Sequence, residues 1–342
     1  MNRLAHAILS DIAQQNSRVS SARIVASLAS QGIEISERTA RYYLKELDRQ
    51  GLTVKRSRSG RNITEKGRQE LRHGFATDRV GFIINKINNL AVLTDFDPAT
   101  QTGRVILNVT YVPERSLATA LDILVQVARS PYTLCDRIVV STAGERIGNL
   151  LVPEGLTAIG SVCSITLNGI MLKSGIPLTP KLGGVVEIAR KKPQHFQSFI
   201  SYESSSVAPL EIFAKSGMTD VLGAVVNGQG AILGSLRMIP EDCLMAAQSV
   251  LMRLEEAGLR NTAIFGHPGQ KLLGIPIAEG KIGMAVLNGL NAHAALSESG
   301  LGTHLHTMAT MVPFEDLKPI SAYRKRLGMQ PMGARVMAGG NV

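Results

Sequence analysis

The sequence contains an internal repeat that covers most of the chain beyond residue 100. Short motifs recur in the same order about 120 to 127 positions later. The matching segments are residues 103–107 and 230–233, 112–114 and 239–241, 154–155 and 279–280, 167–170 and 287–290, and 174–176 and 299–301. Five matches in one order are hard to obtain by chance. We therefore expect two related half-domains, and this expectation constrains the fold more than any other feature.

Each copy of the repeat predicts a strand, a helix and a strand, followed by a further strand and a short helix. Residues 104–112 form the apolar run of a buried strand, and residues 117–128 have apolar side chains at helical spacing. Asn168 and Asn288 are expected to cap the short helices. The glycines Gly175 and Gly300 are expected to end them in the left-handed conformation. The cleft between two such halves is the expected place for a ligand on general grounds.

A different pattern precedes the repeat. Residues 4–15, 22–31 and 36–47 each have apolar side chains at helical spacing, and Ser36 is a good N-cap for the third helix. Residues 52–55 and 62–64 predict two short strands around a basic tip. Three helices followed by a hairpin indicate a winged helix-turn-helix. The expected fold class is therefore mixed α/β (α+β), a winged helix followed by an internally duplicated α/β regulatory domain.

The third helix carries its apolar stripe on one face and hydrogen-bond donors on the other. Such a donor-rich face suits the major groove of DNA, and a basic hairpin suits the flanking phosphates. The predicted DNA-binding residues are Arg38, Thr39, Arg41, Tyr42 and Lys45 on the helix, and Lys55, Arg56, Arg58 and Arg61 on the wing. The competing interpretation is an ordinary solvated amphipathic helix, which the neighbouring cationic tip disfavours.

The distribution of charge supports the DNA-binding interpretation. The chain has a net charge of +10, and residues 1–75 hold 14 Lys and Arg against 7 Asp and Glu. Residues 76–314 hold 18 of each sign, so the long repeat is neutral as a whole. An excess of cations confined to the N-terminal segment is expected if that segment alone meets phosphates.

Other features argue against several classes of protein. The three cysteines, at positions 135, 163 and 243, are widely spaced, which disfavours a disulfide framework and favours a reducing compartment. We expect a cytoplasmic protein without a membrane span, because the uncharged runs contain many Gly, Ser, Thr and Asn. No catalytic motif and no metal motif stands out, and the His304-x-His306 pair is interpreted as hydrogen-bonded or surface histidines. We therefore predict no catalytic residues, no metal and no bound cofactor.

Two groups of segments resemble one known family. Residues 36–44 and 62–67 are similar to the winged helix of the NrpR repressors of nitrogen regulation, and residues 174–187, 201–206 and 209–211 resemble their regulatory domain. The resemblance implies a homodimeric repressor that binds an operator palindrome in double-stranded DNA and is released by 2-oxoglutarate. Some members carry two regulatory domains, whereas this chain has room for one. The expected domains are residues 1–75, a regulatory domain at 80–315 with halves at 80–200 and 201–315, and a tail at 316–342.

A dicarboxylate effector requires cations and N–H or O–H donors in a partly dry cleft. The candidate effector-binding residues are Lys181, Gly183, Gly184, Ser204, Ser205, Ser206 and Arg237. Residues 177–184 are expected to form a loop that is rigid at its prolines and flexible at Gly183 and Gly184, whose backbone N–H groups would be the donors. Two alternatives remain open at this point. The repeat could be an enzyme or metabolite-binding domain that the winged helix targets, or the winged helix could bind a protein partner.

Overall fold

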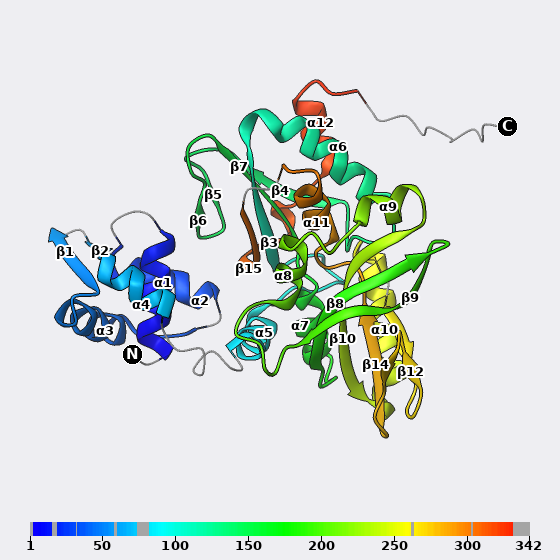
Figure 1. Ribbon diagram of the computed structural model, residues 1–342. Helices are drawn as coiled ribbons and strands as arrows, with labels where there is room; N and C mark the ends of the chain where they lie inside the picture. The colour runs from blue at the N-terminus through cyan, green and yellow to red at the C-terminus, as the bar shows by residue number, and fades with distance from the viewer. Residues whose placement is uncertain are drawn as a thin grey trace.

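The structure is a computed structural model that describes residues 3–15, 19–31, 33–57, 60–73, 82–260, 263–301 and 304–330. The N-terminal unit is mainly helical, and a larger body built on two sheets follows it (Figure 1). The predicted mixed α/β class, with a winged helix before a sheet-rich domain, is confirmed. None of the helices in the described ranges combines the length and apolar content needed to cross a bilayer.

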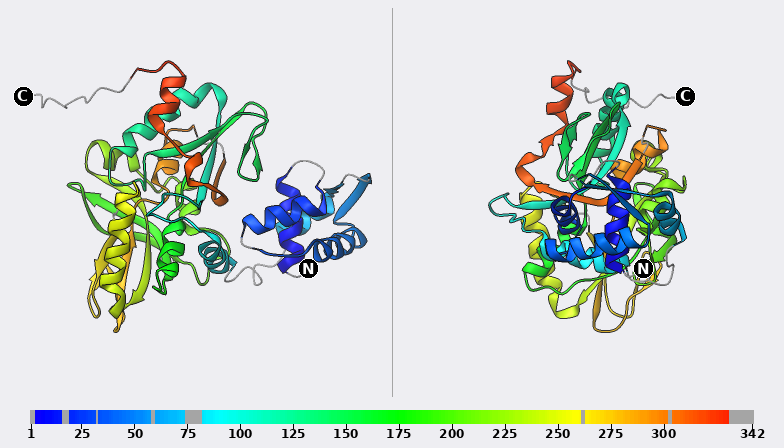
Figure 2. Two further views of the ribbon diagram at one scale, coloured as in Figure 1. Left: turned by 180° about the vertical axis from the view of Figure 1, so that it is seen from behind. Right: turned by 90° about the vertical axis from the view of Figure 1, so that its left-hand side faces the viewer.

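The N-terminal unit has the predicted order of three helices and a hairpin. Its elements are α1 (Arg3–Gln14), α2 (Ser21–Ser30), α3 (Glu37–Arg49), β1 (Thr53–Ser57), β2 (Gly60–Ile63) and α4 (Glu65–His73). One fully buried cluster joins the first three helices, and its side chains include Ile8, Leu9, Ile24, Leu28, Leu44 and Leu47. The unit therefore has a core of its own, and Figure 2 shows it at one side of the body.

In the body, the same order of elements occurs twice. The first series is β3 (Arg104–Pro113), α6 (Leu117–Ala128), β4 (Arg137–Ser141), β5 (Arg146–Ile147), β6 (Leu150–Leu151), β7 (Leu156–Val162), α7 (Ile165–Lys173) and β8 (Thr179–Ala189). The second is β10 (Gly230–Pro240), α10 (Leu244–Glu256), β11 (Ala263–Gly266), β12 (Lys271–Leu272), β13 (Ile275–Pro276), β14 (Lys281–Val286), α11 (Asn291–Glu298) and β15 (His304–Pro313). Short 3-10 turns follow β3, β10 and β15.

The two halves exchange their last strands. One sheet has the order β15-β3-β7-β4-β16, with β16 at Lys318–Pro319, and the other has the order β11-β14-β10-β8-β9, with β9 at Lys192–Ser201. All of the strand pairs in these two sheets are antiparallel. Thus β8 of the first half lies beside β10, and β15 of the second half lies beside β3. The largest buried cluster accordingly contains side chains from both halves. Neither half can be a separate body, because each sheet needs a strand from the other.

Four elements connect or extend the two halves. They are α5 (Phe82–Leu93), β9 (Lys192–Ser201), α8 (Pro209–Lys215) and α9 (Val221–Val226). The predicted tail at residues 316–342 is wrong in part, because β16 (Lys318–Pro319) pairs with β4 and is followed by α12 (Ile320–Arg326). Arg324 of α12 is buried and forms an ion pair with Asp122 of α6. Residues 331–342 lie outside the described part of the chain.

The helix ends agree with the sequence only in part. Gly175 and Gly300 follow α7 and α11 with φ of +76° and +69°, so the predicted left-handed ends are confirmed. The predicted asparagine caps are wrong, because Asn168 lies inside α7 and Asn288 lies before α11. The two helices are related by an offset of 125 residues, so Asn168 and Asn288, which are 120 residues apart, are not equivalent. The equivalent residues are Thr166 and Asn291, and each accepts a backbone N–H from a strand. Thr166 Oγ1 accepts the Ile106 N–H at 3.0 Å, and Asn291 Oδ1 accepts the Leu233 N–H at 2.7 Å.

Candidate functional site

The predicted recognition face of α3 lies at the surface. Ser36 caps the helix by accepting the Thr39 N–H at 3.1 Å, and Leu44 faces the core. Arg38, Arg41, Tyr42 and Lys45 are exposed, and Thr39 is half-buried. Arg41 Nη2 forms an ion pair with Glu37 Oε2 at 2.5 Å, one turn earlier on the same face. This pair is solvent-exposed, so an approaching phosphate could replace the glutamate at little cost.

The wing is held against α3 by a carboxylate. Asp48 Oδ2 accepts from Arg61 Nε at 2.7 Å, and Asp48 Oδ1 accepts from Thr53 Oγ1 at 2.6 Å. Arg61 retains only 16% of its side-chain exposure and also pairs through its backbone with Val19. The structure thus gives Arg61 a structural task that differs from the predicted phosphate contact. Lys55 is exposed, whereas Arg58 and the Arg56 side chain lie outside the described residues.

The predicted surroundings of two effector candidates are wrong. Gly183 and Gly184 were expected in a loop with free N–H groups, but both lie within β8, which pairs with β10 and β9 on its two sides. A Cβ at Gly184 would come within 2.2 Å of the Ser198 carbonyl oxygen, and one at Gly183 within 2.8 Å of the Tyr202 hydroxyl. These glycines therefore permit close packing of neighbouring chain segments.

The remaining surface candidates do not converge on one point. Lys181 Nζ forms an exposed ion pair with Glu203 Oε1 at 3.2 Å. Ser205 is buried in a local turn, where its Oγ donates to the Val207 carbonyl at 2.5 Å. Ser204 is exposed and Ser206 is half-buried. The hydroxyl run therefore shapes the turn after β9 instead of forming a donor cluster with Gly183 and Gly184.

Arg237 is the exception among these candidates. It lies on β10 with 1% exposure, yet it forms no ion pair with a carboxylate in the described part of the chain. Its Nε donates to Asn168 Oδ1 at 2.7 Å, and its Nη2 donates to the oxygens Ser164 O and Ser164 Oγ at 3.2 and 3.0 Å. Its Nη1 is buried without a hydrogen-bond partner. Burial lowers the pKa of this guanidinium, so an anion beside it would offset the free-energy cost of burying its charge.

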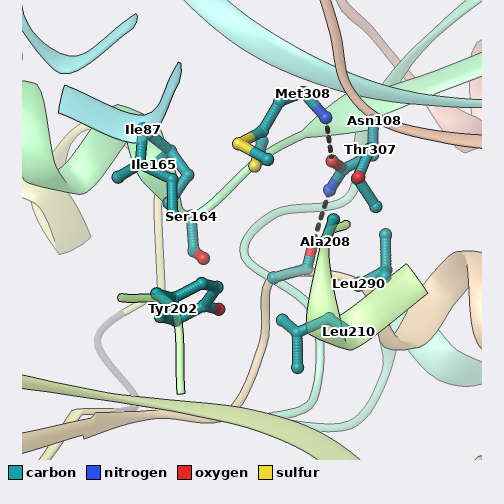
Figure 3. Close-up of a pocket in the computed structure, with 12 residues that line it drawn as sticks. Ile87, Asn108, Ser164, Ile165, Tyr202, Ala208, Leu210, Leu290, Thr307 and Met308 are labelled. Carbon is teal, nitrogen blue, oxygen red and sulfur yellow. Dashed lines mark hydrogen bonds between the residues drawn. The ribbon is translucent and has the colours of Figure 1, made fainter. Parts of the chain in front are cut away.

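A pocket lies between the two halves (Figure 3), and Arg237 is connected to it through Ser164 without being one of its lining residues. The space at this site, counted together with the open solvent at its mouth, is about 370 Å³, and Ser164, to which Arg237 donates, is part of its wall. The other lining residues include Ile87 of α5, Asn108 of β3, Cys163, Tyr202, Leu290 and Met308 of β15. Most of the wall is apolar, with a few polar atoms, as in many small-molecule sites.

The polar groups of the pocket connect separate parts of the chain. Asn108 Nδ2 donates to the Gly289 carbonyl at 2.8 Å, and Asn108 Oδ1 accepts the Met308 N–H at 3.0 Å. Burial raises the pKa values of Cys163 and Tyr202, which stay protonated and neutral. Lys86 of α5 does not line the pocket but lies near Glu211 and Cys163, and burial lowers the pKa of its ammonium. Asn108, Lys86 and Tyr202 were not among the residues predicted to bind an effector.

The equivalent position in the other half has no cation. Thr110 of β3 corresponds to Arg237, and its Oγ1 lies 2.8 Å from His293 Nδ1 on α11. The other ring nitrogen, His293 Nε2, lies 2.8 Å from Ser161 Oγ. Burial lowers the pKa of His293 to about 4, so the ring is neutral near pH 7. The duplicated scaffold therefore presents a charged centre on one side only.

Comparisons with known proteins agree on one family. A family model described as NrpR regulatory domains NRD1 and 2 matches residues 80–319, and a ribonuclease R winged-helix model matches residues 6–71. The global nitrogen regulator NrpRI of Methanosarcina mazei is 32% identical over 313 residues, which cover 92% of this chain and 96% of that protein. This relative is named as a regulator and not as an enzyme, and so are the NrpR proteins of Methanococcus maripaludis and Methanocaldococcus jannaschii.

Longer relatives and a solved structure are also similar. The global nitrogen regulator NrpR of Methanococcus maripaludis is 30% identical over 93% of this chain, but this chain covers only 54% of that protein. A crystal structure of a nitrogen repressor-like protein from Methanococcus jannaschii aligns with a TM-score of 0.57 at 26% identity. The alignment covers 70% of this chain and 98% of that one.

Proposed function

Because the chain belongs to the NrpR family of nitrogen regulators, we propose that it is a DNA-binding repressor that leaves its operator when 2-oxoglutarate binds. The single observation that carries the effector half of this proposal is the buried Arg237, which donates to Ser164 of the pocket wall and whose Nη1 has no hydrogen-bond partner among the described residues. The exposed donor face of α3 carries the DNA half. A regulator of this kind works in the cytoplasm, where operator DNA is accessible.

For the DNA half, α3 enters the major groove of double-stranded operator DNA. Arg41 and Tyr42 face the base edges, and Arg38 and Lys45 face the phosphates. Lys55 on the wing adds a backbone contact. Two copies in a homodimer would place two α3 helices about 34 Å apart, which matches half-sites one helical turn apart. The neutral body supports this arrangement, because it carries no excess charge to repel its second copy.

For the effector half, one carboxylate of 2-oxoglutarate meets the Arg237 guanidinium together with the Ser164 hydroxyl. Such a charge-assisted pair in a dry site is stronger than a neutral hydrogen bond. The second carboxylate extends toward Lys86, whose charged form is disfavoured by burial and only partly stabilised by the nearby Glu211 carboxylate. Arg237 belongs to β10, which also contacts the opposite half. Lys86 belongs to α5, which also contacts the connecting turn. A bound dicarboxylate thereby favours one relative placement of the halves over the other.

The test measures operator affinity and effector affinity separately. Fluorescence anisotropy with a labelled operator fragment gives the Kd for DNA with and without saturating 2-oxoglutarate, and calorimetry gives the Kd for the effector. We expect 2-oxoglutarate to weaken operator binding, and pyruvate, which has one carboxylate, to have little effect. Operator affinity that does not change at saturating 2-oxoglutarate would contradict the proposal. Turnover of a metabolite would instead support the alternative of an enzyme.

A further inference from the structure

The tip of the β5–β6 hairpin contacts the winged helix. Asn149 Nδ2 at this tip donates to Ser30 Oγ of α2 at 2.7 Å and to Ser27 Oγ at 3.4 Å. Figure 1 shows this hairpin reaching out from the body toward the N-terminal unit. These are hydrogen bonds between residues about 120 positions apart in the sequence. The contact therefore joins the two domains directly.

The same tip is also fixed to the strand that borders the pocket. The Asn149 N–H donates to Thr310 Oγ1 of β15 at 3.3 Å. A Cβ at Gly148 would come within 2.1 Å of that hydroxyl oxygen, so the tip lies against β15 without a gap. Two residues earlier, Met308 lines the pocket and has φ of +49° at an irregularity in the pairing of β15 with β3. A shift of Met308 would thus move the surface on which Asn149 rests.

On the winged-helix side, the contact reaches a buried polar network. The Ser27 hydroxyl donates to Asp11 Oδ1, which belongs to a side chain that is 3% exposed, and Gln15 and Gln31 also donate to that carboxylate. This network joins α1 to α2 inside the unit that carries α3. The Asn149 side chain therefore acts on a rigid element and not on a loose loop. Its own Oδ1 is buried without a hydrogen-bond partner among the described residues, so its amide is held there by the donor side.

The second half has an equivalent hairpin, and its tip has a different neighbour. In the β12–β13 hairpin, the Leu273 carbonyl accepts the Phe196 N–H of β9 at 3.0 Å. The body's own extra strand therefore occupies the position next to that tip. In the first half, β15 is the edge strand of its sheet, and the winged helix lies next to the tip instead. The duplication thus leaves one hairpin tip open for docking.

We propose that the β5–β6 tip is the docking point that fixes the winged helix on the regulatory domain, with Asn149 as its positioning residue. Through Thr310, the occupancy of the pocket changes where this tip holds α2 and therefore where α3 lies. The docking itself is independent of any ligand. Its regulatory use rests on the proposed function, because it requires an effector in the pocket.

The test uses the full chain with Asn149→Ala, Ser30→Ala and the double variant. Ser299→Ala is the matched control, because the Ser299 hydroxyl donates locally to the Ala295 carbonyl at 2.9 Å and does not join the domains. The measured quantity is the coupling ratio, which is the operator Kd with saturating 2-oxoglutarate divided by the operator Kd without it. We expect each single variant to reduce this ratio about 2- to 10-fold, the range of one hydrogen bond. The double variant should lose no more than either single one.

Effector affinity distinguishes docking from damage to the pocket. Without DNA, Asn149→Ala should bind 2-oxoglutarate as the parent protein does. A coupling ratio unchanged in both single variants would overturn the proposal. A loss of effector affinity in the absence of DNA that is as large as the reduction of the coupling ratio would overturn it too, because the hairpin would then be part of the pocket.

A second measurement separates this proposal from the function on which it partly rests. Small-angle X-ray scattering without ligand or DNA reports the maximum dimension of each variant. We expect Asn149→Ala and Ser30→Ala to be more extended than the parent and Ser299→Ala. If the parent protein does not respond to 2-oxoglutarate, the regulatory arm fails with the proposed function, and scattering still decides the docking. Identical scattering curves for all the variants would reject the docking.

Discussion

Arg237 and Thr110 occupy equivalent positions on β10 and β3, and each bonds to a helix of the opposite half. Arg237 Nε donates to Asn168 of α7 at 2.7 Å, and Thr110 Oγ1 lies 2.8 Å from His293 of α11. The two pairs therefore join the halves in the same way. One pair carries a guanidinium, and the other is neutral. The duplicated body thus has a symmetric scaffold with an asymmetric charge.

Substitution of this arginine should remove effector binding. In Arg237→Met the ligand carboxylate no longer meets a charge-assisted donor worth about 1.5–3 kcal/mol, so 2-oxoglutarate affinity should fall roughly 10- to 150-fold. Arg237→Lys retains the charge without the fork of donors and should lose less. Isothermal titration calorimetry measures both. Thr110→Val is the matched control at the equivalent position, and an equal loss in that variant would show that the joined halves matter and the charge does not.

The asymmetry also predicts the stoichiometry. With the pKa of His293 held near 4 by burial, the Thr110 side offers no cation above about pH 5. We expect one 2-oxoglutarate per chain and no second binding phase between about pH 6 and 8, where this imidazole stays neutral. Calorimetric titration to saturation measures the ratio. Two equivalent ligands per chain would contradict the assignment of Arg237 as the anion-binding group.

The sequence predicted the duplication because its motifs lie at turns and strand starts, where residue type is tightly restricted. It did not predict the exchange of β8 and β15, because a buried strand has the same apolar pattern beside either neighbour. The Gly183–Gly184 pair suggested a flexible loop, since glycine that permits close strand packing looks identical in sequence to glycine in a turn. Arg237 was among the candidates, but only the fold brings it to Asn168 and Ser164.

Cations of the recognition helix should contribute to DNA binding according to their exposure. Arg38→Ala and Lys45→Ala should each weaken binding to all sequences and reduce the salt slope by about 1 for each phosphate that is no longer neutralised. Arg41→Ala should cost on the order of 1–3 kcal/mol of specific binding if its guanidinium reads a base. Anisotropy titrations at several salt concentrations measure both effects. Arg49→Ala, on the last turn of the same helix and paired with Glu46, is the control and should keep the slope unchanged.

Arg61 should behave differently from these residues. Its guanidinium is held by Asp48, so Arg61→Ala should destabilise the wing by about 1 kcal/mol. Asp48→Ala should cost more, because it also removes the hydrogen bond from Thr53, and the double variant should lose no more than Asp48→Ala alone. The pair of single variants and the double variant form a cycle that urea unfolding can measure. Additive effects of the two substitutions would show that the ion pair does not hold the wing. A loss of DNA affinity larger than that of Arg38→Ala, at unchanged stability, would restore the phosphate role.

The stability of the winged helix should depend on pH through Asp11. Burial raises the pKa of this carboxyl from 3.8 to about 6, against the hydrogen bonds from Ser27, Gln15 and Gln31, which lower it. The folded state therefore binds the proton more tightly than the unfolded chain does. The resulting contribution is complete below about pH 4 and is lost as the pH rises through 6, by an amount on the order of 3 kcal/mol.

Asp11→Asn should remove this dependence, because the amide is uncharged at every pH. Its winged helix should be more stable than that of the parent protein at about pH 7.5 and similar to it at about pH 4, on the two sides of the raised pKa. Hydrogen exchange of peptides from α1 to α3 in the full chain, corrected for the intrinsic exchange rate, measures the local stability of this unit. Gln31→Ala is a milder control, since its amide donates to Asp11 Oδ1 at only 3.5 Å. Parallel pH profiles of the parent and Asp11→Asn would show that another group causes the dependence, because the pKa of Asp11 is then the same in the folded and unfolded states.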